Sequence, residues 1–235
     1  MKEILNLYRS KYKFIDFYDL LSVKILNNNL INSNYHFENT AYKDVNFIYE
    51  TKNNDIRIDL PIWFGNPKHT KLKIMILGRE PRDSNDKYNV EINPDDKYVF
   101  GSPFGIECWT DKNKYYRSFK NVISNPQILT YFTDAVKKYE VKNSKAESDI
   151  NAKTNFWKTA ENSVENFEFL KREIELLAPD VLIGLGNDSY NFLQTKFGDQ
   201  LKVRKIIHPN ARQDKASGKN AWVLASEELD KIIEE

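Results

Sequence analysis

The chain has 235 residues, 40% of them hydrophobic, which suffices for one large domain, or for one domain plus a helical extension. Its single cysteine, Cys108, excludes an internal disulfide framework and suits a reducing cytosol, so we expect a cytoplasmic protein. The net charge of +1 excludes a global basic field, so contact with nucleic acid requires a local patch. No stretch approaches a membrane span, and the charged, amphipathic start does not resemble a signal peptide.

Apolar residues in positions 1–59 recur at roughly helical intervals and predict an N-terminal helical extension packed on the core. An α/β domain is expected to occupy residues 60–235. It begins with a turn-rich stretch, Leu60–Thr70, that leads into an apolar strand, Leu72–Leu77. The motif GREPR follows this strand directly, at Gly78–Arg82.

A long polar loop is predicted after this motif, from Asp83 to about Val99, and it ends at FGSPFG. A second core strand is expected at Ile128–Val136. The remaining predicted elements are a helix at Ser163–Leu177, a buried strand at Val181–Gly186, a helix at Asn187–Lys196 capped by Asn or Asp, a strand at Leu201–Ile207 and a helix at Ser226–Ile233. Strands that alternate with helices predict a three-layer α/β/α sandwich around a mainly parallel sheet of about four strands.

Two short motifs follow predicted strands, GREPR at Gly78–Arg82 and HPNAR at His208–Arg212. In an open α/β sheet, ligands bind beyond the carboxyl ends of the strands. Glu80 and His208 are therefore a candidate catalytic pair. The three histidines have no metal-ligand spacing, so we expect neither a metal site nor a cofactor.

The motifs GREPR, SPFG, a strand with Phe-x-x-Asp, PDVLIGLG and HPNAR, in this order, resemble the uracil-DNA glycosylase superfamily. PFG after the first motif, and Arg after the His-Pro motif, most resemble its single-strand-selective monofunctional branch. PDVLIGLG and TDAVK are also similar to the iron-sulfur bacterial branch, but Cys108 is the only cysteine, so the four cluster ligands are absent. The resemblance implies an enzyme that binds DNA, hydrolyses the N-glycosidic bond of a flipped base and leaves an abasic site. We expect the protein to be a monomer.

The same resemblance assigns roles to single residues. Glu80 would act as general base and electrostatic stabiliser, although a Glu paired with a neighbouring Arg is the alternative. His208 would donate a hydrogen bond to the leaving base, and Phe104 would stack on it unless it is ordinary core. The resemblance also places Gly78 and Asn210 at the substrate. Contacts to DNA are expected from Arg82, Arg212, Lys215 and Lys219.

Asp134 stands where the family usually has an Asn that reads the base edge. An ionised Asp offers only acceptors, so it should repel uracil O4 and accept from an exocyclic amine, as acidic side chains do with cytosine N4. We therefore expect a cytosine-type or other amine-bearing modified base as substrate. The alternative is that Asp134 only pairs with Lys137 or Lys138.

Two other functions stay open on the sequence. A non-catalytic base-binding or DNA-binding module on the same fold would be consistent with the departures from the family at Glu80, Asp134 and Asn210. A hydrolase of free nucleosides or nucleotides is the second, although the chain has neither a P-loop nor a GxGxxG after a strand.

Overall fold

A computed structural model describes residues 3–4, 6–8, 56–58, 62–79, 91–93, 96–100, 114–140, 164–211 and 217–235. In these residues the main sheet has five strands in the order β2-β6-β3-β8-β9. Their bounds are β2 Ile62–Phe64, β3 Leu72–Gly78, β6 Ile128–Asp134, β8 Val181–Leu185 and β9 Lys202–Ile206. All neighbouring pairs are parallel except β2 and β6, which are antiparallel.

The predicted α/β class and the mainly parallel sheet are confirmed. The fifth strand, β2, comes from the stretch that the sequence marks only as turn-rich. Its Trp63 and Phe64 are almost fully buried, and β2 pairs with β6 at the edge of the sheet. Three apolar residues between turn residues are too short a signal for a strand until a partner strand fixes them.

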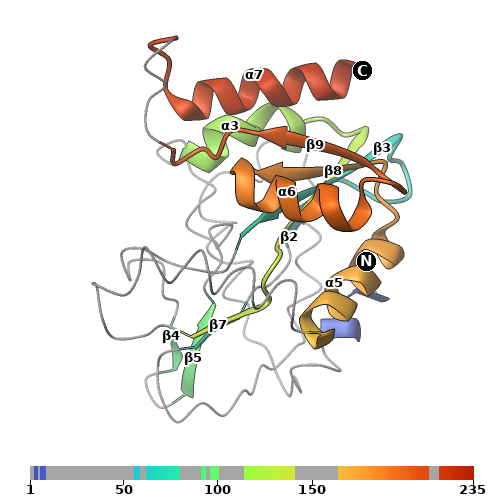
Figure 1. Cartoon of the computed structure of the whole chain (residues 1–235), viewed down its shortest axis with the longest axis vertical. Helices are drawn as coiled ribbons and strands as arrows, with labels where there is room; N and C mark the ends of the chain where they lie inside the picture. Colours follow the sequence, from blue (N-terminus) through green and yellow to red (C-terminus); the bar gives the residue numbers. More distant parts are fainter. Residues whose placement is uncertain are drawn as a thin grey trace.

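Helices cover both faces of this sheet (Figure 1). Figure 1 shows α3 (Lys114–Ile123) and α7 (Ala221–Glu234) together on one face and α6 (Gly186–Phe197) on the other. Phe132 of β6 contacts both Phe64, with ring centroids 6.0 Å apart, and Phe119 of α3, at 5.1 Å, so the core is continuous from β2 to the α3 layer. In the described parts of the chain, no helix combines the length and apolar composition that a membrane crossing requires.

Two predicted helices differ in detail from the structure. The last helix starts at Ala221 instead of Ser226. The helix α6 starts at Gly186, and Leu185, which has no side-chain cap hydrogen bond, stands at its N-cap, so the predicted Asn or Asp cap is wrong. Gly186 has φ +75° and makes the sharp turn from β8 into the helix, which leaves no separate capping residue.

A second, smaller sheet has the strand order β4-β5-β1-β7. Its strands β4 (Glu91–Asn93) and β5 (Asp96–Phe100) form an antiparallel pair inside the stretch predicted to be a loop. Strand β1 (Ile56–Ile58) lies within the stretch predicted to be a helical extension and pairs with β5 and with β7 (Lys138–Glu140). Polar sequence hides these strands because their pairing partners are distant in the chain.

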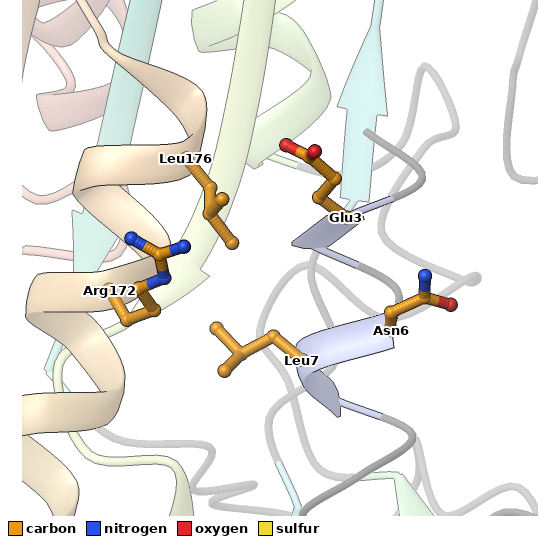
Figure 2. A pocket seen from close by; sticks show the side chains of 5 residues that line it. All are labelled: Glu3, Asn6, Leu7, Arg172 and Leu176. Atoms are coloured by element: carbon orange, nitrogen blue, oxygen red, sulfur yellow. The ribbon is translucent and has the colours of Figure 1, made fainter.

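The start of the chain is helical at Glu3–Ile4 and at Asn6–Tyr8, and it lies beside α5 (Val164–Leu177). Ile4 and Tyr8 are buried, and the Tyr8 ring meets Phe169 edge-on at 4.8 Å. Figure 2 shows the outer seam between the two segments, a shallow pocket lined by Glu3, Asn6, Leu7, Arg172 and Leu176. The domain boundary at residue 59 stays a prediction.

Candidate active site

The end of β6 lies beside the first motif. Gly78, the last residue of β3, is in register with Asp134, the last residue of β6. Two further backbone hydrogen bonds, from Ala135 N to Gly78 O and from Val136 N to Arg79 O, extend the pairing at 3.1 Å each. The residue that would read the base and the start of GREPR are therefore fixed side by side at the carboxyl edge of the sheet.

His208 follows β9 at the same edge. A Cβ placed on Gly186, at the end of β8, would lie 3.6 Å from the Cβ of His208. The edge thus presents, in strand order, Asp134, Gly78, Gly186 and His208. Three strand spacings of about 4.8 Å separate the backbones of β6 and β9 by roughly 14 Å, with β3 and β8 between them.

The ring of His208 has a hydrogen-bond partner at each nitrogen. The backbone N of Asn210 donates to Nδ1 at 3.2 Å, and Tyr115 Oη lies 3.0 Å from Nε2. Burial, with a smaller contribution from the Arg79 charge, lowers the pKa of His208 from 6.5 to about 4. The imidazole is therefore neutral at pH 7, and because Nδ1 accepts, its proton resides on Nε2.

Arg79 links the first motif to helix α6. Its Nη1 lies 3.3 Å from a carboxylate oxygen of Asp188, which is in the first turn of α6, and both side chains are about a quarter exposed. Asp188 is also favourably placed for the helix dipole. This ion pair holds a positive charge close enough to His208 to disfavour the imidazolium form.

Asp134 is completely buried. Side chains alternate along a strand, so Asp134 lies on the same face of β6 as Phe132, which contacts the α3 layer. Lys137, one of the two lysines expected as an alternative partner of Asp134, forms an ion pair with Glu173, at 2.7 Å. The side chain of the other, Lys138, lies outside the described residues.

Three further residues predicted at the site are described by the structure, and they differ in burial and in contacts. Gly78 is buried at the sheet edge, whereas Asn210 is exposed and contacts His208 through its backbone N rather than through its amide. Lys219 is exposed, and its Nζ forms an ion pair with Glu227 at 2.6 Å. Five predicted residues lie outside the described part of the chain, and these are Glu80, Arg82, Phe104, Arg212 and Lys215.

Strand β9 carries three basic residues, Lys202, Arg204 and Lys205, and each of them has a polar partner. Lys202 begins β9 and Arg204 lies at its middle, and both form ion pairs with Glu235, the residue after α7. Lys205 reaches Asn187 Oδ1 at 3.4 Å, near the start of α6. These ion pairs hold the side chains of Lys202 and Arg204 at the C-terminal residue of the chain.

Tyr115 was missed by the sequence analysis because helix α3 was not predicted. The helix has a readable signal, since Tyr115, Phe119, Val122 and Ile123 are spaced i, i+4, i+7 and i+8 and are all buried. Only the fold shows that the first of them reaches the histidine. Among the described side chains, no three His, Cys, Asp or Glu residues group as metal ligands would.

Comparison with known proteins gives one family. No curated protein matches the chain significantly. The model of the uracil DNA glycosylase superfamily matches residues 64–229, which is well over half of the chain. This range begins at the last residue of β2 and ends in α7, so it includes the other four strands of the main sheet and the edge where Asp134 and His208 lie. The chain therefore belongs to the uracil DNA glycosylase superfamily.

Proposed function

We propose that this protein is a monofunctional DNA glycosylase that removes a cytosine-type or other amine-bearing modified base. Members of the superfamily are in general glycosylase hydrolases that act on DNA, so membership already indicates this activity and this partner. The observation that carries the finer proposal is the position of Asp134, buried at the end of β6 and in register with Gly78. A carboxylate offers acceptors only, so the base it contacts must present donors, as an exocyclic amine does.

The neutral His208 is suited to assist the departure of the base. Hydrolysis breaks the bond between C1′ and the base nitrogen, the electron pair leaves with the base, and water oxygen binds C1′. Negative charge then develops on the base, where a fixed N–H donor stabilises it. Nε2 of His208 carries a proton and would donate it as a hydrogen bond to the base carbonyl. Glu80 is proposed to orient and deprotonate the water.

Hydrolysis by water, without a covalent lysine intermediate, is supported by the state of Lys137. This lysine lies three residues beyond Asp134, and its ammonium group is buried against the Glu173 carboxylate. A lysine whose amine is engaged in such a buried ion pair is a poor nucleophile. Borohydride should therefore trap no covalent adduct between the protein and DNA.

The test is excision from labelled oligonucleotides that carry uracil, cytosine or a modified cytosine, with alkaline cleavage to reveal abasic sites. Glu80→Gln and His208→Ala serve as active-site controls. Abasic sites from an amine-bearing base, lost in both variants, would establish the proposal. DNA binding without product from any base would instead indicate a non-catalytic module, and strong activity on uracil would refute the base assignment.

A further inference from the structure

A buried polar network lies beneath the end of β6. Glu173 of α5 is fully buried, and one of its oxygens accepts hydrogen bonds from Tyr8 at 2.7 Å, Thr133 at 3.2 Å and Tyr131. Its other oxygen lies 2.7 Å from Nζ of Lys137, which is 2% exposed. Buried groups of this kind are costly unless every partner is in place, so the network fixes the positions of its members.

The network holds both sides of Asp134. Thr133 precedes Asp134 and takes part in the network twice, because it donates to Glu173 and accepts from Lys137. Side chains alternate along β6, so Thr133 faces the network while Asp134 faces the opposite side of the sheet. Lys137, three residues after Asp134, also belongs to the network, because it forms the ion pair with Glu173. A shift of the network would therefore move the backbone that carries the Asp134 carboxylate.

Helix α5 also forms hydrogen bonds with the backbone that follows Asp134. The Asn166 side chain donates to Ala135 O at 2.8 Å and accepts from Lys137 N at 2.9 Å. On the other side, Ala135 N donates to Gly78 O of β3. The turn from Ala135 to Lys137 is thus bonded to α5 and to the start of the GREPR motif.

The chain before residue 60 contributes to this arrangement at two separate points. Tyr8 donates its hydroxyl to Glu173, lies 3.3 Å from the Thr133 hydroxyl, and has Lys137 Nζ 5.8 Å above its ring. Strand β1 pairs with β7 over Ile56–Ile58 and Lys138–Glu140, directly after the turn. Tyr8 therefore contacts β6 before the turn that follows Asp134, and β1 pairs with β7 after it.

We propose that Tyr8 and strand β1 are structural parts of the base-reading site, and that Tyr8 is a positioning residue for Asp134. The proposal rests on the proposed function for its effect on base choice, but its structural step does not depend on catalysis. Tyr8 acts through Glu173, Thr133 and Lys137 and does not touch the base. Loss of its hydroxyl would leave the Glu173 oxygen with fewer donors and loosen the segment from Thr133 to Lys137.

The test compares the full-length wild type with Tyr8→Phe, which keeps the ring on Phe169 and removes only the hydroxyl. Ile232→Val on α7 is the matched control, because it truncates the core by one methyl group in the layer on the other face of the sheet. Two quantities are measured, namely the ratio of excision rates for a cytosine-type base and uracil, and hydrogen exchange at the amides of Ala135, Val136 and Lys137.

We expect Tyr8→Phe to accelerate exchange at these amides and to lower the base preference by about fivefold, with no such change in Ile232→Val. Unchanged exchange overturns the proposal, as does faster exchange with an unchanged base preference in an active enzyme. Equal effects in both variants would also overturn it, because they would mean general destabilisation. A wild type that excises no base refutes the proposed function, while the exchange rates still decide whether Tyr8 holds the segment.

Discussion

Tyr115 Oη lies 3.0 Å from His208 Nε2, and Asn210 N lies 3.2 Å from Nδ1, so a tyrosine and a backbone amide fix the imidazole between them. The two rings also meet edge-on, with centroids 5.5 Å apart. Because Nδ1 accepts, Nε2 donates to the tyrosine oxygen in the free protein. A bound base carbonyl would share this donor or take it over, so Tyr115 sets how the histidine presents its proton.

Tyr115→Phe removes this contact and keeps the packing. We expect single-turnover excision to slow by about three- to tenfold, because a hydrogen bond that orients a catalytic group is worth roughly 1 kcal/mol. Tyr116→Phe, the same change at the next position of α3, is the control and should leave the rate unchanged. Equal rates for Tyr115→Phe and the wild type would show that the contact has no role in orienting His208.

The lowered pKa of His208 predicts a specific acid sensitivity. In the unfolded chain the group titrates near 6.5, and in the folded protein near 4. Between these values the unfolded state binds the extra proton, so stability falls as the pH falls from 6.5 to 4 and this contribution changes no further below 4. The full difference corresponds to about 3 kcal/mol, and urea unfolding across this pH range measures it.

His208→Asn should remove most of this pH dependence, because the titrating group is gone. In NMR spectra the His208 ring protons of the wild type should titrate near pH 4. Arg79→Gln should raise the His208 pKa only slightly, since burial is the larger cause of its shift. Titration of His208 near 6.5 would contradict the lowering of its pKa by burial.

Asp134→Asn should change the preferred base from a cytosine-type base to uracil. The amide offers a donor and an acceptor, which match O4 and N3–H of uracil, so we expect uracil excision to rise and cytosine-type excision to fall. A ratio change of at least about 100-fold is expected, because mismatched buried polar groups reject a base strongly. Rates measured at saturating enzyme for both bases give the ratio, and an unchanged ratio would mean that Asp134 does not read the base.

The buried ion pair of Lys137 and Glu173 predicts a large loss of stability when one partner is removed. Lys137→Met and Glu173→Gln should each lower the free energy of unfolding, by about 3–5 kcal/mol where a charge is left buried alone. The double variant should lose less than the sum of the two, since neither charge remains. Urea unfolding of the four proteins completes the cycle, and additive losses would show that the two groups are not coupled.

The local sequence predicts the elements whose signal is strong. Long apolar runs predict β3, β6 and β8 to within two residues at each end, because strands covered on both faces need continuous apolar residues. Because the motifs that begin at Gly78 and His208 stand at the ends of predicted parallel strands, the sequence also predicts that these two residues lie at one edge of the sheet. Short or polar strands such as β1, β2 and β4 were not predicted, since pairing with distant segments stabilises them.

The sequence by itself determined the α/β class and the order of the motifs, and it places an Asp at position 134. Only the tertiary structure decided which groups surround them. The contact between Tyr115 and His208 spans 93 positions of the chain, and that between Tyr8 and Glu173 spans 165. Local patterns encode local periodicity, whereas such contacts arise when packing of the sheet and its helices brings distant side chains together. The protonation of His208 depends on that packing too, because burial is its main cause.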